Sequence, residues 1–262
     1  MDVDAYLDRI GADRPAAPSA EALRELQARH LATVPFENLS VHLREPVELA
    51  EDALFDKVVR RRRGGFCYEL NGLFAALLRE LGFEVTLLSA RVWNGERYGP
   101  PFDHMALRVD LPEPWLADVG FGRFARYPVR LDSREPQQDP EGEVVVSETP
   151  QGDLDVRHAG RPAYRLEQRP RELRDFAPTC WWQATSPESH FTTGLLCSLQ
   201  APGGRITLAG DKLIETVDGE RVERVLVGEE ILTAYRVRFG IELNEAPAPG
   251  SFPAPGPRPF PN

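Results

Sequence analysis

Cysteine is scarce in this sequence. Its 262 residues include three cysteines, Cys67, Cys180 and Cys197, and no two of them are spaced as CxxC. An odd count without close pairs argues against a disulfide framework and against a thiolate zinc site. We therefore expect no structural metal, and one of the three thiols is a candidate for chemistry.

Long apolar runs and an excess of basic residues are also missing. No segment approaches the roughly 20 apolar residues that a membrane-spanning helix needs, and the first residues, MDVDAYLDRIG, are acidic rather than a basic leader. The formal net charge of -10 argues against binding to nucleic acid, because phosphate backbones attract basic faces. We expect a cytoplasmic protein without membrane or nucleic-acid partners, in which any anionic small ligand needs a local basic pocket.

The spacing of apolar residues predicts helices in the first third of the chain. MDVDAYLDRIG predicts a short helix stopped by Gly11, and SAEALRELQARHLATV a second one with Ser19 as N-cap. EDALFDKVVRRRR continues the pattern. After Cys67, apolar residues at helical spacing predict a buried helix that begins near the cysteine and ends at Gly82; they are Leu70, Leu73, Phe74, Leu77, Leu78 and Leu81.

From Phe83 the hydrophobic period changes to two, which predicts strands. They are FEVTLLSARVW, HMALRVDL, PWLADVGFG, VVVSE, LDVRHAG and AYRLEQR. Further on, GRITLAGDKLIETVDGERVERVLVG predicts a hairpin at Asp218-Gly219, and EEILTAYRVRFG a helix ended by Gly240. The last stretch, EAPAPGSFPAPGPRPFPN, has the composition of a disordered or polyproline tail.

Cys67 has three features that favour a reactive thiol. It stands at the start of a predicted helix, where free N–H groups and the helix dipole stabilise an anion. It follows a run of arginines, and two glycines before it would let the backbone approach a substrate closely. The alternative is that Cys67 is a small buried apolar residue at a helix start.

A thiolate nucleophile needs a base that another group orients, and five histidines are available. His104 opens HMALRVDL and points away from the apolar row of that strand. Asp118 in WLADVGFG would be costly as a buried carboxylate unless it accepts strong hydrogen bonds, which an imidazole could supply. The alternative is an Asp that caps a turn at Gly120. The other histidines are expected to be a satisfied core residue, His30, or solvated: His42, His158 and His190.

Several motifs in a fixed order resemble the arylamine N-acetyltransferase family. They are YLDRIG, VPFENLS, RRGGFCYELN, HMALRV, WLADVGFG and TSPESHFTTGLLCSLQ, and the resemblance runs from about Tyr6 to about Phe239. It implies that Cys67 is the acyl-accepting nucleophile, His104 its imidazole partner and Asp118 the orienting carboxylate.

The same resemblance implies an α+β multidomain fold with a papain-like Cys-His-Asp core. An N-terminal helical bundle over residues 1–83 would carry the cysteine, and a central antiparallel β-barrel over residues 84–190 would carry His104 and Asp118. A C-terminal α/β lid would span residues 191–244, followed by the proline-rich tail 245–262. The changes of hydrophobic period near Phe83 and after about Phe191 agree with these joins.

Substrate contacts follow from the resemblance alone. Phe36, Phe121 and Phe191 match positions that line the acceptor pocket, although each also suits a hydrophobic core. This chain has PPFD where relatives often have Gly, Thr or Ser, so it departs from the family pattern in part of the coenzyme A region. The residues that match coenzyme A-contacting regions are Pro101, Phe102, Trp182 and Ser189.

The other two cysteines and the arginine run are expected to have no chemical role. Cys180 and Cys197 are interpreted as structural. Arg63 matches the family motif and is a candidate for a structural role, whereas the residues before it, Arg60 to Arg62, are typical of a solvated helix end.

The resulting hypothesis is an N-acetyltransferase with a ping-pong mechanism. The Cys67 thiolate takes the acetyl group from acetyl-CoA, and an arylamine or arylhydrazine then takes it from the acetyl-cysteine. Acetyl-CoA is a co-substrate, and no metal is required. Three alternatives stay open: a macrolactam-forming amide synthase of a polyketide pathway, a papain-like cysteine hydrolase, and a non-catalytic ligand-binding relative.

Overall fold

The first third of the chain is helical, as the apolar spacing predicts. Asp2 and Ser19 cap the first two helices, because their side-chain oxygens accept the backbone N–H groups of Ala5 and Ala22. Gly11 ends the first helix in the left-handed conformation, with φ at 64°. The computed structural model describes residues 1–248, and the helices of this part are α1 (Val3–Ile10), α2 (Ala20–Thr33), α3 (Leu39–His42), α4 (Glu51–Phe55) and α5 (Cys67–Glu80), with a π-helical turn at Asp56–Arg60 after α4.

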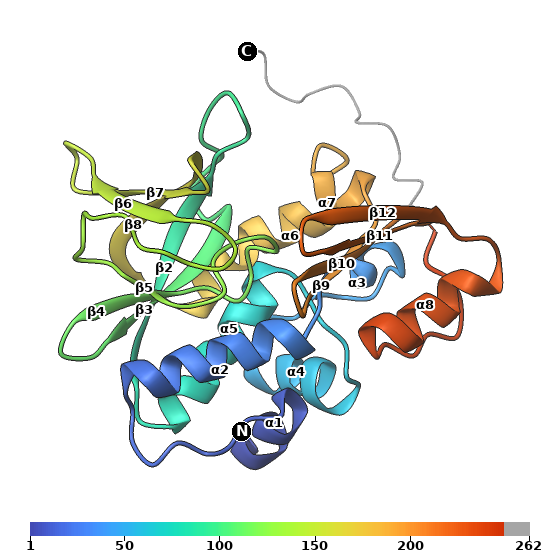
Figure 1. The fold of residues 1–262 in the computed structure, drawn as a ribbon, viewed down its shortest axis with the longest axis horizontal. Coiled ribbons are helices and arrows are strands. Elements are labelled where there is room, and N and C mark those ends of the chain that lie inside the picture. The colour runs from blue at the N-terminus through green and yellow to red at the C-terminus, as the bar shows by residue number, and fades with distance from the viewer. Residues whose placement is uncertain (249–262) are drawn as a thin grey trace.

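Helix α5 lies at the centre of the molecule, between the other helices and a large sheet (Figure 1). Its residues from Cys67 to Leu78 are all buried. It begins at the cysteine, as predicted, and Gly82 just beyond its end has φ at 88°. The spacing that predicts this helix is therefore confirmed, and its first residue faces the sheet.

Seven antiparallel strands form the larger sheet, in the order β5-β4-β3-β2-β8-β7-β6. The sheet curls into a nearly closed, barrel-like form (Figure 1). Alternation places Met105 in the core shared with the helices and Ala106 in the core inside the curled sheet. The strands are β2 (Glu84–Val92), β3 (His104–Asp110), β4 (Pro114–Ala117), β5 (Val129–Arg130), β6 (Val144–Glu148), β7 (Leu154–His158) and β8 (Arg161–Arg171).

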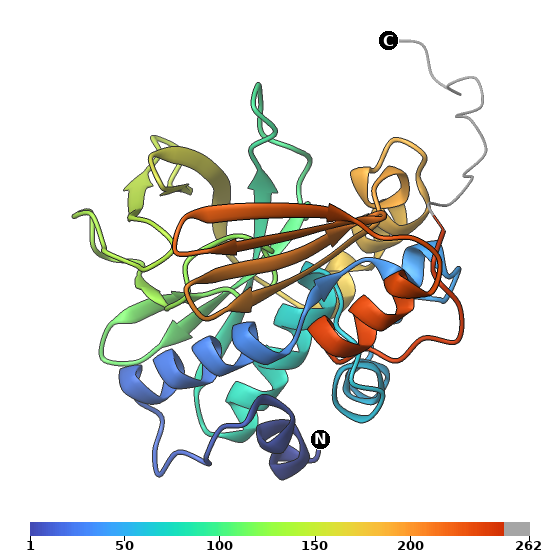
Figure 2. The ribbon, with the colours of Figure 1, turned by 45° about the vertical axis from the view of Figure 1, so that its right-hand side comes forward.

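A second antiparallel sheet, in the order β1-β9-β10-β11-β12, lies beside the first (Figure 2). Asp218 and Gly219 form its last turn, since Val217 pairs with Glu220. The hairpin predicted there is confirmed, and Gly240 ends the following helix with φ at 67°. The elements are β1 (Phe36–Glu37), β9 (Leu196–Ala201), β10 (Gly204–Ala209), β11 (Lys212–Val217), β12 (Glu220–Val225) and α8 (Glu229–Phe239).

Two features of this arrangement differ from the expected helix-then-strand order. Strand β1 comes from the predicted helical bundle, yet Phe36 pairs with Ser198 in the second sheet. Between the two sheets the chain forms a 3-10 turn at Leu173–Phe176 and the helices α6 (Ala177–Thr185) and α7 (His190–Thr193). Elements this short repeat their hydrophobic period too few times to be detected in a sequence.

The predicted domain boundaries at residues 83, 190 and 244 stay a prediction. The described part of the chain contains three buried apolar clusters: one among the helices, one inside the curled sheet, and one around Tyr235 beneath the second sheet. Most of the predicted proline-rich tail, residues 249–262, lies outside the described residues. Within residues 1–248, no helix has both the length and the apolar character needed to cross a membrane.

Two buried ion pairs hold the segment that leads into α5. The Arg63 guanidinium lies 3.0 Å from the Glu37 carboxylate, and the Lys57 ammonium lies 2.6 Å from that of Glu69. The second oxygen of Glu69 accepts the N–H of Phe66, the residue before α5. Burial alone would raise the pKa of Glu37, but the charges of Lys57 and Arg63 outweigh burial and lower it. The structural role expected of Arg63 agrees with this geometry.

We predict that Arg63→Met lowers the free energy of unfolding by about 3–5 kcal/mol, because it leaves the buried Glu37 carboxylate without the guanidinium that pairs with it. Arg61→Met is the matched control. Arg61 pairs with Asp56 at 3.1 Å on the surface, and such a pair contributes about 1 kcal/mol or less. Urea denaturation measures both variants. Equal stability of the two variants would contradict a structural role for the Arg63–Glu37 pair.

Candidate active site

The glycines before Cys67 fit tightly against protein atoms rather than facing an open space. A Cβ at Gly64 would overlap the carbonyl oxygen of Pro35, and one at Gly65 would lie 2.5 Å from the Glu69 carboxylate. The expectation that these glycines let the backbone approach a substrate is therefore wrong. They are needed because the chain passes between β1 and α5 with no room for a side chain.

His104 and Asp118 are in direct contact. Nε2 of His104 lies 2.7 Å from Oδ2 of Asp118, and both side chains are buried. An ionised carboxylate can only accept, so Nε2 carries the hydrogen of this bond. The imidazole then keeps Nδ1 as the nitrogen available to another group. The strand β3 begins at His104, and β4 ends one residue before Asp118.

Three further donors satisfy the buried Asp118 carboxylate. The Asn71 amide and the Gly120 backbone N–H donate to Oδ1, each at 2.9 Å. The Tyr164 hydroxyl donates to Oδ2 at 3.1 Å. Together with His104, these donors remove the cost that the sequence predicts for an unpaired carboxylate at this position.

Helix α5 carries both Cys67 and a residue that fixes Asp118. Asn71 stands one helical turn after Cys67 and uses both of its amide hydrogens, on Asp118 and on the Met105 carbonyl oxygen at 2.6 Å. A Cβ at Gly120 would lie 2.7 Å from the Cα of Cys67. The loop after Asp118 therefore lies directly against the first residue of α5.

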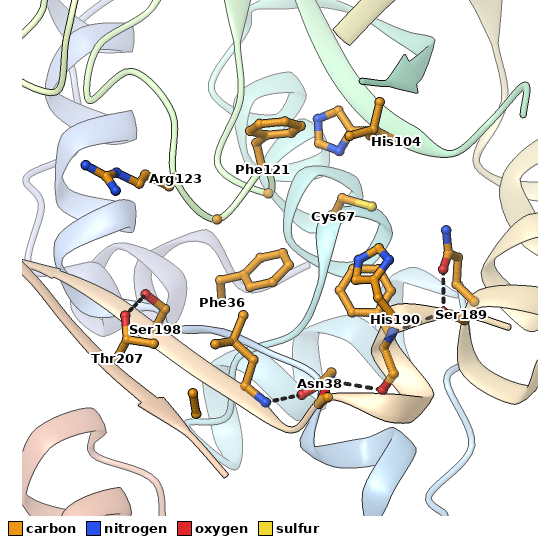
Figure 3. A pocket seen from close by; sticks show the side chains of 18 of the residues that line it. Phe36, Asn38, Cys67, His104, Phe121, Arg123, Ser189, His190, Ser198 and Thr207 are labelled. Atoms are coloured by element: carbon orange, nitrogen blue, oxygen red, sulfur yellow. Dashed lines mark hydrogen bonds between the residues drawn. The ribbon is translucent and has the colours of Figure 1, made fainter. Parts of the chain in front are cut away.

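A cavity of about 970 Å³ opens beside these residues, and both Cys67 and His104 line it. Figure 3 shows the two side chains on its wall, with the rings of Phe36 and Phe121 extending toward them. Phe191, the third predicted pocket residue, also lines the cavity. A space of this size can hold a drug-sized or cofactor-sized molecule.

The residues predicted to contact coenzyme A divide into two groups. Trp182 and Ser189 line the cavity, whereas Pro101 and Phe102 are not among its lining residues. The Phe102 ring instead packs against Phe176, with centroids 5.3 Å apart. The Ser189 hydroxyl is engaged within the protein, because it donates to the Gln183 side chain at 2.6 Å.

The arginine run does not act on Cys67 as the sequence suggests. Arg60 to Arg62 are exposed, and the Arg63 charge is matched by Glu37. Burial raises the pKa of the Cys67 thiol well above its ordinary value, and a hydrogen bond with the Met105 backbone offsets part of that rise. A thiolate at Cys67 therefore depends on a cationic partner, and His104 is the cavity-lining group suited to that part.

Other expectations from the sequence need smaller corrections. His42 is buried rather than solvated, and its Nε2 lies 3.3 Å from the Gly194 carbonyl oxygen. His30 is a core residue, as expected, whose Nδ1 bonds the Tyr6 hydroxyl at 3.0 Å. The two other cysteines, Cys180 and Cys197, are buried, and neither lines the cavity.

Two residues of the site were missed in the sequence. Asn71 could have been found, because it lies four positions after Cys67, a spacing that places both side chains on one face of a helix. Tyr164 has no local signal, since its contact with Asp118 joins positions 46 residues apart. Among residues 1–248, no group of three or more His, Cys, Asp or Glu side chains is arranged to hold a metal ion.

Known proteins are similar to this chain over nearly its whole length, including the residues of this site. A protein-family model described as N-acetyltransferase matches residues 19–248. The arylamine N-acetyltransferase of Mycolicibacterium smegmatis is 38% identical over 259 residues, which cover 94% of this chain and 94% of that protein.

Solved structures give the same result. The arylamine N-acetyltransferase from Salmonella typhimurium matches with a TM-score of 0.86 and 34% identity, over 93% of this chain and 92% of that one. The Mycobacterium marinum enzyme in complex with CoA has a TM-score of 0.83 and 33% identity, over 92% and 93% of the two chains. The range 19–248 that the family model matches includes Cys67, His104 and Asp118.

We predict that Cys67 reacts with iodoacetamide rapidly even near pH ~6, because an ion pair with protonated His104 would overcome the effect of burial on the thiol. Burial raises the pKa values of Cys180 and Cys197, so these two should react slowly or only at high pH. The measurement is the alkylation rate against pH, resolved by peptide mapping.

His104→Gln is the matched variant for this measurement. Without the imidazolium, the Cys67 rate should rise only at high pH and resemble that of the other two thiols. A wild-type Cys67 that reacts only above the ordinary thiol pKa of about 8.5 would contradict the ion pair.

Proposed function

This chain belongs to the arylamine N-acetyltransferase family, and we propose that Cys67, His104 and Asp118 are its catalytic triad. The protein transfers the acetyl group of acetyl-CoA to the nitrogen of an arylamine or arylhydrazine. The observation that carries the proposal is the 2.7 Å contact between His104 and Asp118 on the wall of the cavity that Cys67 also lines.

In the proposed resting state, Asp118 fixes the imidazole of His104. The carboxylate accepts the Nε2–H, which leaves Nδ1 to take the proton of the Cys67 thiol. The product is a thiolate–imidazolium pair. The other three donors to Asp118 keep its orientation fixed during this transfer.

The first half-reaction moves the acetyl group to the enzyme. The Cys67 sulfur attacks the thioester carbonyl of acetyl-CoA, and the tetrahedral intermediate expels coenzyme A as a thiolate, which takes the proton from His104. Attacking and leaving groups are both thiolates of comparable stability, so the exchange is close to balanced. The Cys67 backbone N–H, in the first turn of α5, is a donor for the oxyanion.

The second half-reaction regenerates the thiol. The amine nitrogen attacks the acetyl-cysteine carbonyl, His104 accepts the proton that the nitrogen loses, and the Cys67 sulfur leaves and is reprotonated. The rings of Phe36, Phe121 and Phe191 provide an aromatic surface for the amine beside the acetyl-cysteine. No step requires a metal.

Coenzyme A would occupy the part of the cavity that Trp182 and Ser189 line. Trp182 offers a partly exposed ring, whereas the Ser189 hydroxyl already donates to Gln183, so Trp182 is the stronger candidate for direct contact. That Pro101 and Phe102 contact coenzyme A stays a prediction, and the lining of this cavity does not support it. The second sheet, with residues 191–244, would act as the lid.

The proposed location is the cytoplasm. All three cysteines carry free thiols, and thiols stay reduced in that compartment. Both substrates, acetyl-CoA and a small aromatic amine, must therefore be available in the cytoplasm.

The proposed function predicts that coenzyme A release depends on an amine acceptor. With acetyl-CoA alone, the protein should release about one equivalent of coenzyme A and then stop, because the acetyl-cysteine waits for an amine. Adding an arylamine should start continuous release, with one amine consumed for each coenzyme A. Continuous release without amine would instead support the hydrolase alternative.

Asp118→Asn tests the triad within the same assay. The amide cannot hold the imidazole tautomer or stabilise its cation, so amine acetylation should fall by about a hundredfold or more. Asp110→Asn, at the far end of β3 and partly exposed, is the matched control and should keep near wild-type turnover. Near wild-type turnover in Asp118→Asn would contradict the assignment of the third member.

A further inference from the structure

The cavity continues from Cys67 across the face of the second sheet. Arg205 on β10 lines this part, together with Ser198 on β9 and Thr207 on β10. Figure 3 shows Ser198 and Thr207 joined by a hydrogen bond on the side of the cavity near Arg123. No step of the proposed reaction uses these residues.

The Arg205 guanidinium has buried donors without partners. Nη1 donates to the Ser198 hydroxyl at 3.1 Å. Nε and Nη2 are inaccessible to solvent and bond no other described atom of the protein. Leaving such donors unsatisfied is costly, and more so for a charged group. Five N–H groups in a planar fork are suited to a carboxylate or phosphate, which can accept two of them at once.

The charges around Arg205 are of both signs. Burial is the main cause that lowers the pKa of Arg205; the Glu141 carboxylate raises it, and Arg123, which lines the same cavity, lowers it by a smaller amount. Glu141 also lines the cavity, but neither Nε nor Nη2 of Arg205 has a hydrogen-bond partner among the described residues. An oxyanion that contacts Arg205 would supply the hydrogen bonds that Glu141 does not make.

We propose that Arg205 is a substrate-recognition residue that binds an oxyanion, either a carboxylate on the arylamine or a phosphate of coenzyme A. The inference rests on the proposed function and adds a substrate property to it. A carboxylate and a phosphate can each present two oxygen atoms to the guanidinium group. The carboxylate would belong to the arylamine, and the phosphate would belong to acetyl-CoA.

The test compares charged and uncharged forms of each substrate with Arg205→Gln. The amine pair is para-aminobenzoate and its methyl ester, and the donor pair is acetyl-CoA and S-acetylpantetheine, which lacks the phosphates. If Arg205 binds a carboxylate on the amine, KM for para-aminobenzoate should be about tenfold or more higher in Arg205→Gln than in the wild type, while KM for the methyl ester stays unchanged. If Arg205 binds a phosphate on the donor, the same rise should occur for acetyl-CoA and not for S-acetylpantetheine.

Two further variants control this test. Arg205→Lys keeps the charge without the planar fork and should show a smaller rise in the same KM. Arg224→Gln replaces an exposed arginine on β12 that does not line the cavity, and it should change none of the four values.

The reaction between the two uncharged substrates, the methyl ester and S-acetylpantetheine, distinguishes a failure of this proposal from a failure of the proposed function. Transfer between these two by Arg205→Gln at the wild-type rate would show an intact fold and an intact triad. Equal KM changes for charged and uncharged substrates, or no change in any, would overturn the role of Arg205. Failure of the wild-type protein to acetylate any amine would overturn the proposed function instead.

Discussion

The buried carboxylate of Asp118 is the constraint on which the rest of the site depends. Its four donors come from helix α5, strand β3, strand β8 and the loop that follows Asp118 itself. An ionised group in this position is stable only while all of these elements keep their places. The same hydrogen bonds that satisfy Asp118 therefore join the helical part of the protein to the curled sheet and place His104 beside the cavity.

Cys67 is positioned by a second buried network on the other side of α5. The Glu37–Arg63 and Lys57–Glu69 pairs fix the segment before the helix, and Gly64 passes the Pro35 carbonyl with no room for a side chain. The charges in this network balance one another, so the buried thiol receives no net cation from it. A protonated His104 must supply the positive charge, which makes thiolate formation depend on the imidazole that Asp118 holds.

How much of the structure can be predicted from the sequence depends on how far apart in the chain the interacting residues lie. Local signals were sufficient for the caps at Ser19 and Gly240 and for the helix that begins at Cys67, because those contacts lie within a few residues. The proposed triad could be predicted only through motifs in a fixed order, because hydrophobic periodicity does not show which helices and strands lie next to one another. Tyr164 could not be predicted, because its contact with Asp118 joins positions 46 residues apart. Arg205 could not be predicted either, because the cavity that it lines is formed by residues from distant parts of the chain.

The central claim is that Cys67 carries the acetyl group between the two substrates. The most direct measurement is mass spectrometry of the protein after mixing with acetyl-CoA alone, with the modified peptide identified by fragmentation. The account predicts one added acetyl group, located on Cys67 and lost when an arylamine is added. An acetyl group on Cys180 or Cys197, or an unmodified protein that still acetylates the amine, would contradict it.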